Sequence, residues 1–172
     1  MSEDFAHRLP LSQIRDGDRI DLIADETQCN AIAKRLGLPS IDRLEAHAAL
    51  ARKGEQIRAV GRVKSMLAQS CSATGEPLPA RVDEPFEILF VPEPKGGPDD
   101  EVELDAKDLD VVFHDGGGIE LGTAIADTLM LSLDPYPRGP NADEALKAAG
   151  VLSEEQAGPF AALAKLKGKM GE

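Results

Sequence analysis

Arg58, Arg62 and Lys64 are the residues of this chain whose type and spacing best suit the binding of an anion. They alternate with apolar residues such as Ile57 and Val63. Because successive side chains of a β-strand point to opposite faces, the cations would share one face and the apolar residues the other. We therefore predict that Arg58, Arg62 and Lys64 contact an RNA backbone, a partner or the protein's own acidic loop. The alternative is an ordinary solvated face, which antiparallel sheets commonly have.

Cysteine and histidine are too sparse to predict catalysis or a metal site. A structural zinc ion needs about four nitrogen or sulfur ligands, and Cys71 has no Cys, His or Asp in the few residues that follow it. His7, His47 and His114 are far apart, and none stands in a familiar catalytic motif. We expect no catalytic residue, no metal and no cofactor. A small hydrolase stays open as a third function, because catalytic triads are defined by geometry and not by order in the sequence.

Gly116-Gly117-Gly118 precedes a predicted helix and could form a nest of backbone N–H groups for phosphate. The run is not followed by the Lys and Ser or Thr of a phosphate loop, and Asp115 adds negative charge before it. We interpret it as a tight turn from strand to helix.

The hydrophobic period changes along the chain and predicts mixed structure. Three stretches alternate with a period of two: residues 44–50, 56–70 and 80–91. They predict an antiparallel meander, although the alanines of the first leave a helix open. Shorter strands are predicted at 8–14 and 109–113, and helical spacing is found at 26–36 and 120–133. We predict an α+β domain in which helices flank the meander, either as an open sheet or curled toward a barrel.

Length and charge suggest how the chain is organised. Its 172 residues fit a single domain at 1–140 and a peripheral helical tail at 141–172. The net charge is −12, but residues 92–110 hold eight acidic side chains against two lysines, whereas residues 43–64 hold six basic side chains against two acidic ones. We expect an acidic, mobile loop near 92–108. A negative total repels free nucleic acid, so we expect no binding to DNA.

The sequence also predicts a cytoplasmic protein without membrane contact. No stretch approaches the ~20 apolar residues that span a bilayer, and the first residues lack a secretory signal. Two cysteines cannot build the disulfide framework of a small secreted domain.

Three stretches, in order along the chain, are similar to segments of one known family. Residues 61–86, with Cys71, resemble its core of strand, Cys-x-x-Cys, turn and strand. Residues 119–137 resemble its acidic and apolar helix ending in Leu-Pro, and residues 158–167 its C-terminal Asn-Pro-Phe-x-x-Leu-x-x-Leu-Lys tail. The chain thus resembles the YceD family, long catalogued as a domain of unknown function, over nearly its whole length.

The resemblance implies a role in the synthesis, processing or stability of large-subunit ribosomal RNA, with no established enzymatic activity. The chain departs from the family where Thr74 replaces the second Cys, and where residues 136–141 lack the Cys that relatives often carry. If relatives bind a metal through these thiols, this chain has lost the site.

Two functions by binding stay open. The first is a ribosome-assembly or rRNA-stability factor that associates with a ribosomal protein or with the pre-ribosomal large subunit, with or without direct contact to rRNA. The second is a small acidic adaptor that binds a basic protein through residues 99–110 without touching RNA.

Overall fold

The computed structural model describes residues 5–94 and 110–151. Most of the predicted acidic loop and the predicted helix at 160–167 lie outside these residues. The prediction that the loop is mobile, and the division at residue 140, stay predictions.

The chain forms two compact units, and each is described by itself. The described part of the first consists of residues 5–69, 79–94 and 110–135. The described part of the second consists of residues 70–78 and 136–151.

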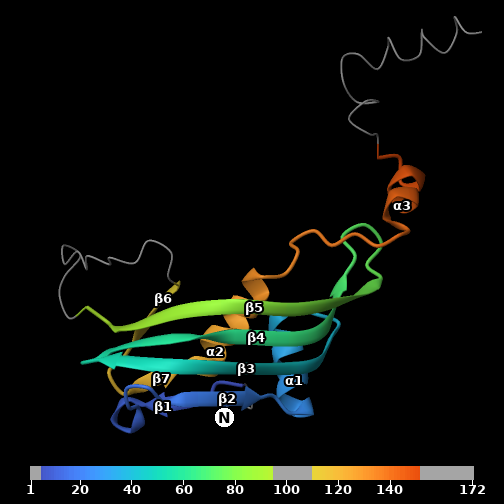
Figure 1. Ribbon diagram of the computed structural model, residues 1–172. Helices are drawn as coiled ribbons and strands as arrows, with labels where there is room; N and C mark the ends of the chain where they lie inside the picture. Colours follow the sequence, from blue (N-terminus) through green and yellow to red (C-terminus); the bar gives the residue numbers. More distant parts are fainter. Residues whose placement is uncertain (1–4, 95–109, 152–172) are drawn as a thin grey trace, which may run out of the picture. The chain divides into compact units, whose positions relative to one another are not determined.

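Within the described residues, five strands form one mixed sheet (Figure 1). In spatial order they are β2 (Arg19–Ile23), β3 (Ser40–Lys53), β4 (Gln56–Ser70), β5 (Pro77–Pro92) and β6 (Asp110–His114). β3 pairs antiparallel with both β2 and β4, whereas β6 pairs parallel with β5. The α+β prediction is confirmed. The sheet stays open, with β2 and β6 as its outer strands, and does not close into a barrel.

The long strands follow the predicted alternation. On β4, Ile57, Ala59 and Val63 are fully buried while Arg58 and Lys64 are exposed. The alanine-rich stretch is strand and not helix, because β4 pairs with β3 along nearly its whole length and every second side chain of β3 enters the core.

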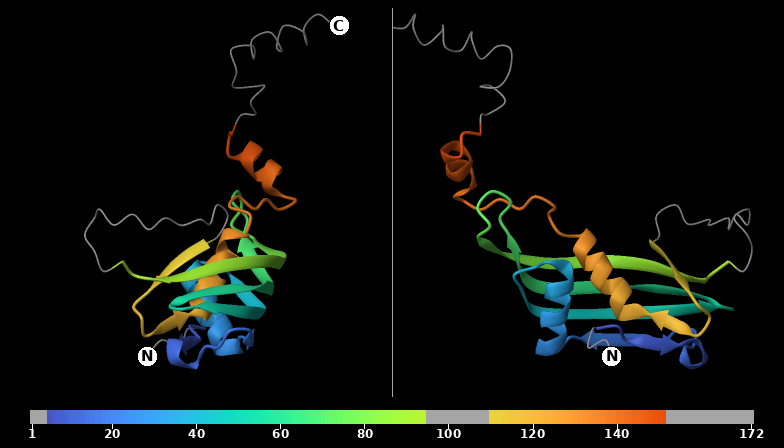
Figure 2. Two further views of the ribbon diagram at one scale, coloured as in Figure 1. Left: turned by 60° about the vertical axis from the view of Figure 1, so that its left-hand side comes forward. Right: turned by 180° about the vertical axis from the view of Figure 1, so that it is seen from behind.

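Two helices cover one face of the sheet, and no other helix or strand of residues 5–94 and 110–151 covers the opposite face. α1 (Glu26–Leu36) and α2 (Leu121–Leu131) lie behind the strands in Figure 1 and in front of them when the molecule is seen from behind in Figure 2. Asp25 caps α1 by accepting a hydrogen bond from the Gln28 N–H at 2.8 Å, and Gly37 closes it with a φ of 66°. The predicted helix at 26–36 is confirmed at both ends, and the second predicted helix is slightly shorter than expected.

Gly61, at the centre of β4, stands where the sheet has no room for a side chain. A Cβ there would lie 1.9 Å from the carbonyl oxygen of His47 and 2.8 Å from Cζ of Phe86. Phe86, on β5, packs across the space that the glycine leaves, so the core and the β3–β4 pairing both depend on this residue.

A second, two-stranded sheet joins β1 (Arg8–Pro10) to β7 (Gly118–Glu120). The strand predicted at 8–14 is correct only for its first three residues, because a 3-10 helix, η1 (Leu11–Gln13), follows Pro10. β2 and β7 were not predicted: both are short, and their apolar residues are too few to show a period.

The second unit contains the turn between β4 and β5 and the segment with α3 (Ala142–Ala148). The Ser72 N–H donates to the Pro137 carbonyl at 2.8 Å, and the Gly139 N–H donates to the Cys71 sulfur at 3.4 Å. These two hydrogen bonds join the turn between β4 and β5 to the segment before α3, although the two are far apart in sequence.

Candidate nucleic-acid interface

The uncovered face of the sheet carries the predicted cations. Arg58, Arg62 and Lys64 all project from β4 on the side away from the core, as their alternation predicted. The structure therefore brings the three together on one face. Two of them, however, have partners that the sequence pattern did not reveal.

Arg62 and Arg58 are paired with carboxylates of the neighbouring strand β5. The Arg62 Nε lies 2.7 Å from Asp83 Oδ1, and its Nη2 donates to the Asp83 carbonyl at 3.2 Å. Arg58 pairs in the same way with Glu87. The hydrogen bond from Arg62 is the main reason that the pKa of Asp83 is lowered. Two of the three positive charges of the predicted stripe are thus balanced locally by β5.

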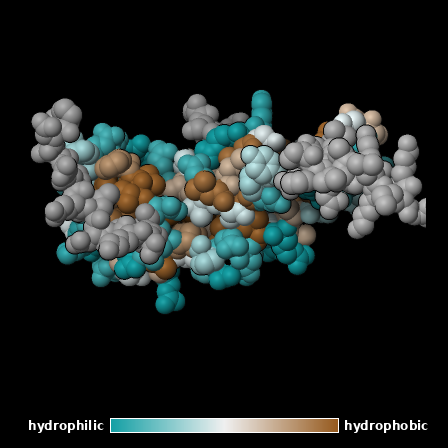
Figure 3. Space-filling view, turned by 90° about the horizontal axis from the view of Figure 1, so that it is seen from above, coloured by the Kyte–Doolittle hydropathy of each residue, from teal (hydrophilic) through white to brown (hydrophobic). Residues whose placement is uncertain are grey.

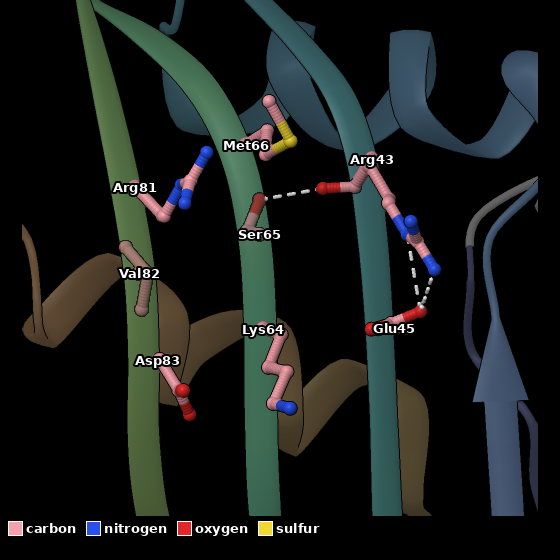
Figure 4. Close-up of a pocket in the computed structure, with 8 residues that line it drawn as sticks. All are labelled: Arg43, Glu45, Lys64, Ser65, Met66, Arg81, Val82 and Asp83. Atoms are coloured by element: carbon pink, nitrogen blue, oxygen red, sulfur yellow. Dashed lines mark hydrogen bonds and ion pairs between the residues drawn. The ribbon is translucent and has the colours of Figure 1, made fainter.

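Lys64 differs from both arginines because it forms no ion pair with any described residue. It lines a shallow hollow of about 250 Å³ together with Arg43 of β3 and Arg81 of β5 (Figure 4). Arg81 likewise has no ion-pair partner among residues 5–94 and 110–151. Three neighbouring strands therefore each place one cation at the same hollow, which Glu45 and Asp83 also line, and two of these cations, Lys64 and Arg81, form no ion pair with a described residue.

Arg43 is held at the hollow by a carboxylate and by the local backbone. Its Nη2 lies 2.6 Å from Glu45 Oε2, two residues along β3. The pairing of β3 with β4 shifts between Ile41 and Arg43, which is the mark of a β-bulge. Buried Ser65 donates its hydroxyl to the Arg43 carbonyl at 2.9 Å, so the irregular backbone keeps a hydrogen-bond partner (Figure 4).

The charge of this face has the opposite sign to that of the whole chain. We use the name basic face for the cations Arg19, Arg43, Arg58, Arg62, Lys64 and Arg81 on β2 to β5, together with the carboxylates Asp21, Glu45, Asp83 and Glu87 between them. Six positive and four negative charges give a net charge of +2, whereas the chain carries −12. Sequence reasoning missed Arg43 and Arg81, because only the pairing of the strands brings them next to Lys64.

The histidines lie on separate elements. His47 projects from β3 on the basic face opposite Arg62, and His7 belongs to the segment before β1. His114 is buried on β6: its Nδ1 accepts the Gly116 N–H at 3.1 Å, so its Nε2 carries the proton that is donated to the Glu55 carbonyl at 2.8 Å. Both ring nitrogens of His114 therefore form hydrogen bonds with the backbone of the protein.

The glycine run forms a turn, as interpreted from the sequence. Gly116 and Gly117 donate their N–H groups to the side chains of His114 and Asp115, at 3.1 and 2.8 Å. Gly118 already belongs to β7. These two N–H groups are therefore engaged within the turn and do not form an open nest.

The two thiols have different environments. Burial raises the pKa of Cys29 on α1. Hydrogen bonds from the Thr74 hydroxyl and from the Gly139 N–H lower the pKa of Cys71 to about 7. Among the described residues, no group of three His, Cys, Asp or Glu side chains could hold a metal ion. Thr74 stands where the family resemblance places a second Cys, and its hydroxyl is shared between the Cys71 thiol and Glu76 Oε2, which lies 3.1 Å away.

A family model described as large ribosomal RNA subunit accumulation protein YceD matches residues 59–167, more than half of the chain. The chain belongs to the YceD family. The YceD match begins on β4 and includes Lys64 and Arg81, whereas Arg43 and Arg58 precede it. No curated protein and no solved structure matches the chain in the corresponding comparisons. The YceD description links the family to large-subunit rRNA accumulation and names no reaction.

None of the helices in the described residues is long and apolar enough to cross a membrane.

Proposed function

We propose that this protein supports the accumulation of large-subunit rRNA as a non-enzymatic factor that binds the RNA, within its precursor particle, in the cytoplasm. The basic face makes the contact: Arg58, Arg62 and Lys64 of the predicted stripe act together with Arg43 and Arg81. The observation that carries the proposal is the pair of cations Lys64 and Arg81, which form no ion pair with a described residue and line one hollow of a strongly acidic chain.

The binding mechanism is electrostatic. Lysine and arginine side chains that contact phosphates release counterions from the RNA, and this release supplies much of the binding free energy. The covered face of the sheet is occupied by α1 and α2, so the uncovered face is the one that can lie against a large ligand. An rRNA segment covered in this way is shielded while the subunit is assembled, and shielding raises the amount that accumulates.

The test is charge reversal at the two cations without partners. The variant K64E/R81E should lose most of its co-sedimentation with large-subunit precursors, and the residual binding should depend less steeply on salt. The variant K34E reverses one exposed charge on α1, on the helix side of the sheet, and is the control for the single reversal K64E. Exposed charge changes usually alter stability by less than about 0.5 kcal/mol, so these variants should fold.

This pair of residues gives a sharper test than reversal of the whole predicted stripe. Glutamate at position 62 would face Asp83, and glutamate at position 58 would face Glu87. Loss of binding in R58E/R62E/K64E could therefore result from repulsion within the sheet as well as from lost phosphate contacts.

Nuclease treatment separates RNA binding from the adaptor function. If the folded K64E/R81E variant sediments with precursors as the wild type does, the basic face is not the contact. If the association of the wild type survives nuclease, the protein is an adaptor that binds a basic ribosomal protein. Deletion of the gene, followed by measurement of the ratio of large-subunit to small-subunit rRNA, tests the accumulation role itself.

A further inference from the structure

We infer, on the basis of the proposed function, that the RNA on the basic face is helical and is contacted through its phosphates, and that it is not a single strand whose bases stack on the sheet. The argument uses three properties of the face: its lack of aromatic rings, its width and the way its arginines are held.

Single-stranded RNA is usually bound by stacking its bases on aromatic side chains, while paired RNA is recognised by shape and by backbone contacts. Among the described residues of β2 to β5, no Phe, Tyr or Trp projects from the basic face, since Phe86 and Phe90 are buried in the core. The uncharged side chains exposed there include Val60 and Met66, at 43% and 44%. Val60 and Met66 can make van der Waals contacts with RNA, but they have no ring on which a base could stack.

One exposed aromatic ring does project on this side of the sheet, but at its edge. Phe113 of β6 is 50% exposed and is the register partner of Val91. Val91 stands four residues beyond Glu87 on β5, which is about 13 Å at the rise of a β-strand. Figure 3 looks onto the edge of the sheet at β5 and β6, where hydrophobic patches are separated by hydrophilic side chains. A continuous track for stacked bases is therefore absent from the described residues.

The cations are spread over an area and do not follow a narrow groove. Arg19 lies on β2 and Arg81 on β5, so they are separated by three strand spacings, or about 14 Å. From Arg58 to Lys64 the charges extend about 20 Å along β4. The hollow at Lys64, and a second one bounded by Arg19, His47 and Arg62, are both shallow and open. Such a surface suits the two backbones of an RNA helix.

Arginine can also stack on bases, because its guanidinium group is planar. On the basic face, however, Arg43, Arg58 and Arg62 each have this group paired with a carboxylate. These pairs hold the three guanidinium groups beside the sheet, which leaves Lys64, Arg81 and, at the β2 edge, Arg19 to meet phosphates as charges.

The experiment measures affinity by fluorescence anisotropy for two hairpin RNAs of different sequence and for an unpaired RNA of equal length. The full-length wild type should bind both hairpins equally, and at least about tenfold more tightly than the unpaired RNA. K64E/R81E should weaken hairpin binding about tenfold or more, with a salt slope smaller by about one for each cation lost. F113A should bind the hairpins within twofold of the wild type.

The outcomes distinguish this inference from the proposed function. Preference for the unpaired RNA, or a tenfold loss in the folded F113A variant, would overturn the helical assignment while leaving RNA binding in place. Binding to none of the three RNAs would overturn the proposed function, and this inference with it.

Discussion

Replacing Gly61 with alanine should destabilise the protein severely, although only one methyl group is added. The new Cβ would lie 1.9 Å from the His47 carbonyl oxygen, and real Cβ atoms essentially never come closer than 3.0 Å, so β3 and β4 would have to separate by about 1.1 Å. Ladder hydrogen bonds span only about 2.7–3.2 Å and would break locally. Overpacking costs about 1–3 kcal/mol and each lost bond about 1 kcal/mol. We expect a loss of about 3 kcal/mol.

Urea unfolding followed by far-UV circular dichroism measures this loss directly. A loss of about 3 kcal/mol is a large part of the 5–15 kcal/mol that stabilises a typical domain, and it should lower the melting temperature by roughly 6–12 °C. Gly117 provides a matched control. A Cβ there would approach only the ends of the Arg8 and Asp115 side chains, at 3.0 and 3.2 Å, and these ends can turn away. G117A should cost less than about 1 kcal/mol.

The reasoning is refuted if G61A unfolds within about 1 kcal/mol of the wild type with an unchanged m-value. That result would mean that the two strands can separate without loss of their pairing, or that Phe86 can leave its place over the glycine at little cost.

Two further predictions concern the turn at Cys71. Because Thr74 replaces a thiol, a chelator should leave the thermal midpoint unchanged, and elemental analysis that finds a stoichiometric metal in untagged protein would contradict this. Thiolate absorbance should show one group that titrates near pH 7, Cys71, and one above its usual value of 9.0, Cys29. Because the pKa of Cys71 is lower in the folded chain, the stability that it contributes is fully present above pH 9 and is lost as the pH falls through 7. T74A should move the lower midpoint upward, since the Thr74 hydroxyl is the main cause of the shift.

The sequence predicts the parts of this fold that are determined by local periodicity. The helix at 26–36 was correct because Asp25 and Gly37 specify its two ends chemically. The strands from 44 to 91 were correct because buried and exposed residues alternate along most of their length. β6 was expected to return to the sheet, but its parallel pairing with β5 depends on the path of the chain between them, which no local pattern encodes.

The candidate site was predicted only in part, for the same reason. Arg58, Arg62 and Lys64 were placed on one face by their spacing within β4. That Asp83 pairs with Arg62, and that Arg43 and Arg81 flank Lys64, depends on the register between strands. The register between strands decides which residues, about 20 apart in sequence, become neighbours. The pattern of a single strand does not contain this information.

The carboxylates of the basic face already pair with Arg43, Arg58 and Arg62, so an anion that binds there must compete with them. A ligand that contacts Arg62 must first displace Asp83, which stands 2.7 Å away at a very high effective concentration. An isolated phosphate or a nucleotide can reach only one or two of these cations at a time, so it replaces contacts that are already in place and gains little. A densely charged polymer offers many charges at once and can displace several carboxylates together. For the proposed RNA ligand, this arrangement favours a polyanion over the small anions of the cell.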